Sequence, residues 1–315
     1  MLPSLPNHAP PDVPMALLTS LPLTAEHWTA LAMNASWQTT RMNLNTFARH
    51  GVLDSPSAVE TIAGRLRDRK AIAKAKALPY QLLAAAVHAN AMPIAIRDAL
   101  HDALEIATEQ VPALPGRVWV LVDVSGSMHS PITGDRGSAT TAVQCVQVAG
   151  LMAASVLRRN PAARIIAFSD QASPIDLNPR DTVITNAQRL ASFPAAGTNC
   201  SAPLKWMNDR NEQGDLVIFV SDNESWMDTR RGPGPTQTLA EWERFRRRNP
   251  HAKLVCVDLQ PNPHTQALDR EDILNVGGFS DAVFGVIASF AQSGQSGQSA
   301  DGPGHWVREI ASITI

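Results

Sequence analysis

The feature that most constrains the fold is a change of hydrophobic pattern near residue 116. From residue 24 to about residue 110, apolar residues recur at the spacing of a helix, and no strand-like alternation is present. After residue 116, short continuous apolar runs alternate with helical stretches, beginning with residues 117–122 (RVWVLV). Short buried strands that alternate with helices predict a parallel sheet covered on both faces.

This change of pattern predicts two folded parts, and a length of 315 residues agrees with about two domains. A hydrophobic content of 44% is enough for a sizeable core. The predicted fold class is α + α/β. We assign residues 1–22 to an irregular proline-rich arm, residues 23–114 to a helical, HEAT-like segment and residues 115–315 to a doubly wound, Rossmann-like domain. Residues 306–315 follow a Gly/Ser-rich linker and are expected to dock on the body of the protein.

Individual elements follow from the same patterns. Helices are expected to open at residues 24, 57, 79 and 93, the second behind a capping box of Ser57 and Glu60 and continuing to residue 76. In the second part, strands are expected at 117–122, 164–168, 215–221 and 253–259. Helices are expected there at about 139–159, 181–192, 200–209, 239–248 and 281–290.

Composition excludes several classes of protein. Because 27 Lys and Arg balance 29 Asp and Glu, the chain is not a strongly basic nucleic-acid coat, although a local basic patch is compatible with that balance. No apolar run approaches the roughly 20 residues that span a membrane, and the first residues lack the pattern of a secretory signal. The three cysteines lie far apart and fit neither a disulfide framework nor a C-x-x-C metal pair, so a cytoplasmic location is expected.

The strongest chemical signal is an Asp-x-Ser-x-Ser loop directly after the first predicted strand, formed by Asp123, Ser125 and Ser127. Two further polar loops match it, because Thr198 lies just before a predicted helix and Asp222 directly follows the third predicted strand. In a doubly wound sheet, ligands bind at the carboxyl ends of the strands. Carboxylate and hydroxyl oxygens suit a hard cation such as Mg²⁺. A helix-capping turn is the alternative explanation of the pentapeptide, but three such loops in order favour a cation site.

No catalytic set accompanies these loops. An aspartyl-phosphate phosphatase needs a second acid two residues after the nucleophile, where this chain has Ser125. The sequence has no complete G-x-G-x-x-G dinucleotide loop, no G-x-S-x-G elbow and no Walker loop. We therefore expect a binding protein rather than an enzyme.

The three loops resemble those of a von Willebrand factor A domain with a metal-ion-dependent adhesion site. This resemblance rests on residues 123–128 (DVSGSM), 197–201 (GTNCS) and 219–225 (FVSDNES). Within this class of domain, the loops are similar to those of the Ro autoantigen family. This similarity rests on residues 194–198, 222–224 and 276–280. In the helical part, residues 34–37 (NASW), 42–46 (MNLNT) and 78–83 (LPYQLL) resemble the end of that family's TROVE module.

The resemblance implies a function and a ligand set. Members of the Ro family bind small non-coding Y RNAs and misfolded RNAs, so an RNA partner in a ribonucleoprotein is expected. The adhesion-site pattern implies Mg²⁺ held by Asp123, Ser125, Ser127, Thr198 and Asp222, with a position open for a carboxylate of a protein partner. Family members have a longer helical ring before the A domain, and this chain resembles only its last helices, which implies a short or N-terminally truncated member.

A basic segment in the helical part is the candidate RNA-contact surface. Residues 41–76 hold eight basic and three acidic side chains in a near-neutral protein. The candidate phosphate contacts are Arg41, Arg49, Arg65, Arg69, Lys70 and Lys76. A solvated helix face is the other explanation of this segment. A continuous exposed basic face would favour RNA binding, whereas scattered or paired basic residues would favour a metal-dependent protein-interaction module.

Overall fold

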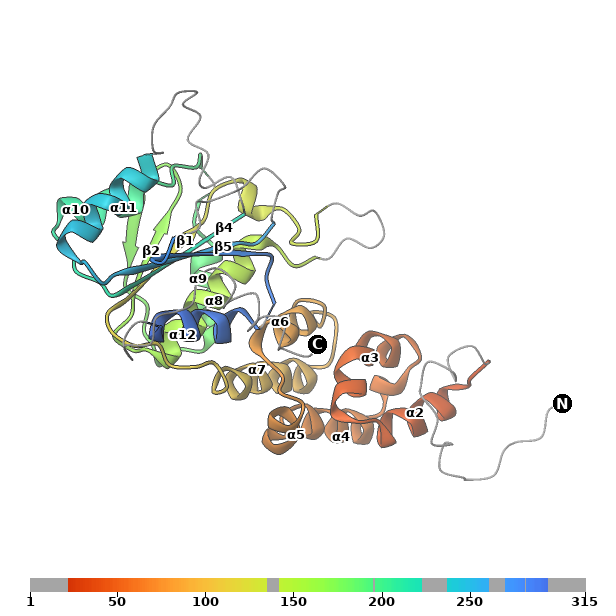
Figure 1. Ribbon diagram of the computed structural model, residues 1–315. Helices are drawn as coiled ribbons and strands as arrows, with labels where there is room; N and C mark the ends of the chain where they lie inside the picture. Colours follow the sequence, from red (N-terminus) through yellow and green to blue (C-terminus); the bar gives the residue numbers. More distant parts are fainter. Residues whose placement is uncertain are drawn as a thin grey trace. The chain divides into compact units, whose positions relative to one another are not determined.

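Figure 1 shows the computed structural model, which describes residues 22–134, 142–194, 196–222, 237–260, 270–280 and 282–293. The chain divides into two compact units, one formed by residues 1–110 and the other by residues 111–315. Apart from Pro22, the predicted proline-rich arm lies outside the described residues, and so does the predicted docking segment at residues 306–315.

The first unit is helical, as the periodicity predicts. Its helices are α2 (Ala25–Asn34), α3 (Trp37–Arg49), α4 (Pro56–Leu66), α5 (Arg69–Lys74), α6 (Pro79–Val87) and α7 (Ile94–Thr108), with a 3₁₀ turn η1 (Val52–Asp54). Thr24 caps α2 and forms a capping box with His27: the His27 N–H donates to Thr24 Oγ1, and the Thr24 N–H donates to His27 Nδ1. This end of the helix therefore satisfies two of its own backbone donors.

The prediction of one helix over residues 57–76 is wrong in two respects. The structure holds two helices there, because α4 ends at Leu66 and the Asp68 carboxylate caps α5 by accepting hydrogen bonds from two backbone N–H groups, at 2.9 and 3.2 Å. The expected capping box does not form, because α4 begins with Pro56 in its first turn and Ser55 as its N-cap.

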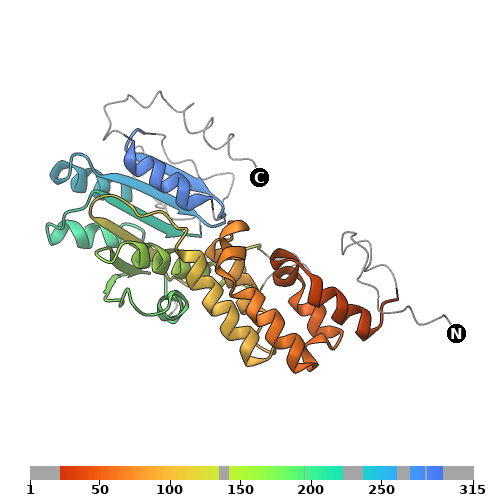
Figure 2. The same ribbon diagram turned by 90° about the horizontal axis from the view of Figure 1, so that it is seen from below.

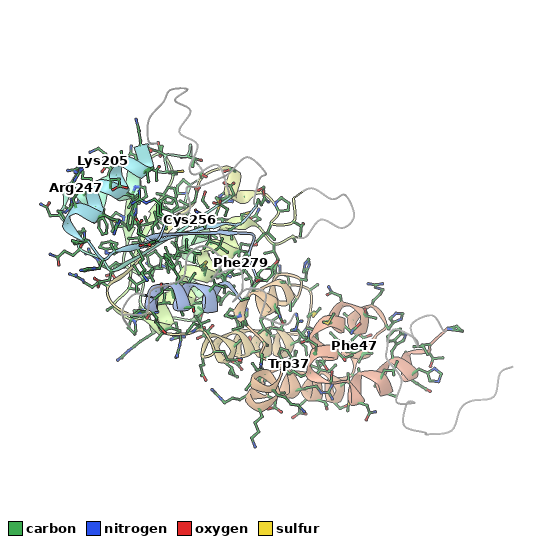
Figure 3. All side chains as sticks on the ribbon, in the orientation of Figure 1. Trp37, Phe47, Lys205, Arg247, Cys256 and Phe279 are labelled. Carbon is green, nitrogen blue, oxygen red and sulfur yellow. The ribbon has the colours of Figure 1, made fainter. Side chains whose placement is uncertain are left out.

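The apolar stripe of α7 lies in the core of the first unit. Ile96 and Leu100 are fully buried, whereas Ile94 in the first turn is 65% exposed. Trp37 and Phe47 bury their rings from α3 (Figure 3), and the Trp37 indole N–H donates to the carbonyl oxygen at the end of α4, at 2.9 Å. The helices of this unit are thus joined by apolar contact and by a buried side-chain hydrogen bond.

The second unit is built on a six-stranded sheet with the order β3-β2-β1-β4-β5-β6. Its strands are β1 (Val118–Asp123), β2 (Arg164–Phe168), β3 (Ala172–Ile175), β4 (Leu216–Ser221), β5 (Lys253–Asp258) and β6 (Ile273–Gly277). All four predicted strands are confirmed within one residue at either end. The predicted parallel pairing is confirmed for β1, β2, β4, β5 and β6, and β3, which was not predicted, pairs antiparallel with β2 at one edge.

Helices cover both faces of this sheet, as predicted. They are α8 (Cys145–Arg159), α9 (Val183–Ala191), α10 (Ala202–Asp209), α11 (Gln237–Arg248) and α12 (Val283–Gln292). Helices α10 and α11 lie over one face, where their side chains share a core with β1, β2, β4 and β5, and α8, α9 and α12 lie over the other (Figures 1 and 2). Among the residues that the structure describes, no helix is long and apolar enough to cross a membrane.

Candidate functional site

The predicted cation site lies where the strand order reverses. Strands β1 and β4 are neighbours, and from this point the chain winds toward β2 on one side and β5 on the other. Asp123 is the last residue of β1, and Ser221 is the last residue of β4, with Asp222 next to it. The carboxyl ends of parallel strands at such a switch point form the usual ligand crevice of this architecture.

Asp123 is the central group of this site. It is fully buried, with one carboxylate oxygen accepting from the Ser125 N–H at 2.8 Å and the other from the Ser221 hydroxyl at 2.7 Å. Burial raises the pKa of Asp123, while hydrogen bonds from Ser125 and Ser221 lower it and the nearby charge of Asp222 raises it. A bound cation would favour the ionised carboxylate that burial disfavours.

The hydroxyl groups come from two loops that touch. Ser125 Oγ lies 3.3 Å from Ser127 Oγ, and the N–H between them, on Gly126, donates to the Ala196 carbonyl at 3.0 Å. This bond holds the first loop against the segment that carries Thr198. Ser125 is buried, whereas Ser127 and Thr198 are exposed, so the hydroxyl side of the site faces solvent.

The residues present fit a hard divalent cation. The predicted ligands offer two carboxylates and three hydroxyls, and oxygen ligands of this kind suit Mg²⁺. Within the described ranges, no group of three or more His, Cys, Asp or Glu side chains could hold a metal. Burial raises the pKa of the nearby Cys145 thiol to about 11, so it stays protonated and is a poor ligand for a soft metal.

Ser221 takes part in this site although it is not among the predicted ligands. It stands inside the Ser-Asp-Asn-Glu motif that singled out Asp222, so a signal was present. Its hydroxyl orients the Asp123 carboxylate rather than offering a ligand of its own. Only the register of β1 against β4 reveals this contact, which joins residues 98 positions apart.

The stretch that builds this site matches a known domain. Residues 117–291, more than half of the chain, match the family model described as the Ro60 vWA domain. The chain belongs to the Ro60 vWA domain family. The matched residues include every predicted metal ligand and all six strands of the sheet, and the Ro60 vWA domain thus accounts for the predicted von Willebrand factor A fold.

Relatives of the family match beyond this domain. The chain is 29% identical over 265 residues to the RNA-binding protein RO60 of Deinococcus radiodurans, covering 79% of this chain and 48% of that protein. It is 24% identical over 313 residues to the RNA-binding protein RO60 of Caenorhabditis elegans, covering 91% of this chain and 46% of that protein. The crystal structure of the Deinococcus radiodurans RO (RSR) protein superimposes with a TM-score of 0.68 at 25% identity, covering 88% of this chain and 59% of that one. The chain therefore spans about half the length of the curated relatives it matches.

Three of the six candidate RNA-contact residues already have partners within the helical unit. The Arg41 guanidinium donates to the Gln81 carbonyl at 3.1 Å, and Arg69 forms an ion pair with Glu109. Arg65 donates to the carbonyl oxygens of Ala32 and Met33 and to the Thr40 hydroxyl, at 2.6, 2.5 and 3.0 Å. These side chains hold helices together, so the basic face is not continuous.

The other three candidates are open to solvent. Arg49, Lys70 and Lys76 are exposed, and so is Lys74. None of these four forms an ion pair with a residue that the structure describes. Lys70, Lys74 and Lys76 lie within or directly after the short helix α5, so three ammonium groups are presented within seven residues.

Replacing Arg65 by Ala is expected to destabilise the helical unit by about 2 kcal/mol, because the carbonyl groups at the end of α2 lose charged hydrogen bonds. Urea denaturation followed by circular dichroism measures the change. Replacing Arg49 by Ala is the matched control and is expected to leave the midpoint unchanged. An unaltered midpoint in the Arg65 variant would contradict the structural role of this side chain.

Proposed function

We propose that the chain binds RNA as a Ro-like ribonucleoprotein component, through its helical unit, and that its A domain binds Mg²⁺. The supporting observation is that a relative named RNA-binding protein RO60 matches 91% of the chain, so the similarity extends over the helical unit as well as the A domain. The expected RNA partners are small non-coding Y-type RNAs or misfolded RNAs. We place the protein in the cytoplasm, in agreement with three buried cysteines that form no disulfide.

The lysines of α5 are the part of the basic segment best suited to phosphate contacts. Lys70, Lys74 and Lys76 are exposed and carry no ion pair with any described residue, so a phosphate would not have to displace an acidic partner. Phosphate contacts of this kind supply most of the affinity for RNA and carry little sequence information. The RNA surface therefore centres on α5 rather than on all six basic candidates.

Replacing Lys70, Lys74 and Lys76 together by Ala is expected to weaken binding of all RNA sequences alike. The slope of log affinity against log salt should fall by about three, because each lysine that neutralises a phosphate contributes about one. Filter binding at several salt concentrations measures this slope. The triple Lys→Arg variant keeps the charges and should bind like the unmodified protein, and an unaltered slope in the Ala variant would contradict this assignment.

The A domain supplies the second part of the proposal. Asp123, Ser125, Ser127, Thr198 and Asp222 would hold the cation, directly or through water. Bound there, Mg²⁺ would provide an electrophilic point to which an anionic group can bind. Because Ser127 and Thr198 are exposed, a carboxylate of a protein partner could reach it from solvent. Binding rather than catalysis is the proposed role, since the sequence holds no recognisable nucleophile with its base.

A second candidate function is a metal-dependent protein-interaction module that does not bind RNA. The observation in its favour is that Arg41, Arg65 and Arg69 make structural contacts, which breaks up the basic face. RNA crosslinking in cells followed by sequencing separates the two. Crosslinked RNA fragments support the Ro-like function, and their absence together with Mg²⁺-dependent protein partners supports the module.

A further inference from the structure

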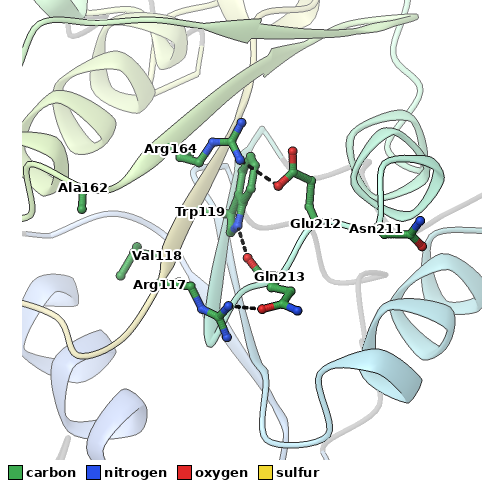
Figure 4. A pocket seen from close by; sticks show the side chains of 8 residues that line it. All are labelled: Arg117, Val118, Trp119, Ala162, Arg164, Asn211, Glu212 and Gln213. Carbon is green, nitrogen blue, oxygen red and sulfur yellow. Dashed lines mark hydrogen bonds and ion pairs between the residues drawn. The ribbon is translucent and has the colours of Figure 1, made fainter.

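A second group of polar and aromatic side chains lies at the opposite end of the A-domain sheet from Asp123, where the strands begin. This end is called the amino-terminal edge of the sheet. Arg117 precedes β1, Arg164 is the first residue of β2 and Gln213 precedes β4, so these residues mark the amino ends of three strands. They surround an open cavity of about 310 Å³, lined mainly by Arg117, Trp119, Arg164, Asn211, Glu212 and Gln213 (Figure 4). Its volume is at the lower end of the range for small-molecule sites.

A tryptophan supports the arginine at the upper wall of this cavity. The Arg164 guanidinium carbon lies 4.3 Å from the ring centroid of Trp119, and the Trp119 indole N–H donates to the Gln213 carbonyl at 2.9 Å, which fixes the ring (Figure 4). Trp119 is only 2% exposed, whereas the Arg164 side chain is 54% exposed. The guanidinium therefore has one face on the indole, its Nη1 is paired with Glu212, and about half of the Arg164 side chain is open to solvent.

A second stack of the same kind stands next to the first. The Arg210 guanidinium carbon lies 4.3 Å from the ring centroid of Trp206, and the rings of Trp206 and Trp119 meet edge to face with centroids 6.3 Å apart. Arg210 is exposed and forms no ion pair within the described part of the chain. Two guanidinium groups, each stacked on a tryptophan, are thus carried by a pair of tryptophans that contact each other.

The charge of this edge suits a phosphodiester. Arg117 pairs with Asp215 at 3.3 Å and Arg164 pairs with Glu212 at 2.7 Å, which leaves the charge of Arg210 in excess. In the first pair both side chains are about half exposed, and exposed ion pairs of this kind contribute little stability, so a phosphate that takes the place of Asp215 on the Arg117 guanidinium gives up little. Arg117 also donates to the Gln213 side chain, which holds its guanidinium at the cavity (Figure 4).

We propose that this edge of the A domain binds a short single-stranded segment of RNA. Bases stack on the guanidinium planes of Arg164 and Arg210, the Asn211 amide offers hydrogen bonds to a base edge, and Arg117 meets the phosphate backbone. Stacking on planar groups together with cationic contacts is how proteins hold unpaired nucleotides. The site rests on the proposed RNA-binding function and adds a contact surface separate from the lysines of α5.

The test replaces Arg by Lys, because Lys keeps the positive charge but lacks the planar guanidinium group on which a base could stack. Fluorescence anisotropy of a labelled oligouridylate with the full chain should show about tenfold weaker binding in the Arg164→Lys/Arg210→Lys double variant, with the salt slope unchanged. Arg189→Lys, on the exposed surface of α9, is the matched control and should bind like the unmodified protein. Inorganic polyphosphate should bind the double variant and the unmodified protein equally, since it has no bases.

Three results would overturn the proposal. Equal oligouridylate affinity of the double variant and the unmodified protein would show that the guanidinium planes contribute no stacking, while RNA binding through α5 would stand. Displacement of the RNA by oligoglutamate as effectively as by unlabelled RNA would assign the edge to acidic protein partners. Failure of the unmodified protein to bind any RNA would remove the proposed function itself. A thermal melt of each variant shows that the fold is retained.

Discussion

Replacing Asp123 by Asn is expected to abolish Mg²⁺ binding by the A domain while leaving the domain folded. The substitution removes one of only two carboxylates among the predicted ligands, and neutral hydroxyls supply little attraction for a cation. The loss should exceed the roughly 10- to 100-fold that follows from removing a group that merely orients a ligand. Isothermal titration calorimetry with MgCl₂ measures it, and an unchanged binding heat in the variant would refute the site.

Two companion measurements separate a lost ligand from a damaged fold. Without metal, the Asp123→Asn variant should be at least as stable as the unmodified protein at neutral pH, because burial disfavours the charge that the substitution removes. Ser221→Ala removes only the hydroxyl that donates to Asp123, so it should weaken Mg²⁺ binding by about 10- to 100-fold without abolishing it. Equal loss in both variants would mean that orientation of the carboxylate, not its charge, decides affinity.

Replacing Asp272 by Ala is expected to destabilise the A domain by about 3 kcal/mol, because the buried Trp242 indole N–H loses its acceptor and two arginines lose a buried carboxylate partner. Asp272 is 8% exposed and accepts from the Trp242 indole N–H at 2.8 Å and from Arg270 Nε at 2.9 Å, with Arg246 Nη1 at 3.3 Å. These contacts join α11 to the segment that leads into β6. Urea denaturation monitored by tryptophan fluorescence measures the effect.

Glu243→Ala is the matched control for this network. Glu243 also pairs with Arg270, but its side chain is 43% exposed. Its removal should therefore lower the free energy of unfolding by less than about 1 kcal/mol. The loss of stability in the Asp272→Asn variant should lie between those of the two Ala variants, since the amide oxygen can still accept from Trp242 while the charge is gone. A Glu243 variant as unstable as the Asp272 variant would show that burial of the carboxylate is not what makes it important.

Hydrophobic patterning was sufficient to predict the architecture. The four strands buried on both faces are continuous apolar runs, and such runs are visible without knowledge of any partner. The proximity of Asp123 to the end of β4 was predictable for the same reason, because both residues stand at the carboxyl ends of those strands and share one edge of the sheet. The two missed strands carry weak local signals: β3 contains Pro174 and β6 contains Asn275 and a terminal glycine.

Contacts between residues distant in the sequence decided which partners the polar side chains have. Sequence spacing placed Arg41, Arg65 and Arg69 in one basic segment, but each is held by a partner 25 to 40 positions away. The Arg–Trp edge of the A domain likewise joins Trp119 to Gln213 across 94 positions, which no local pattern records. Periodicity reports which face of an element is buried, because that depends on neighbours in the chain. What a polar side chain binds depends on which strands and helices pack beside it, and here that is set by strand order and by the loops that join them.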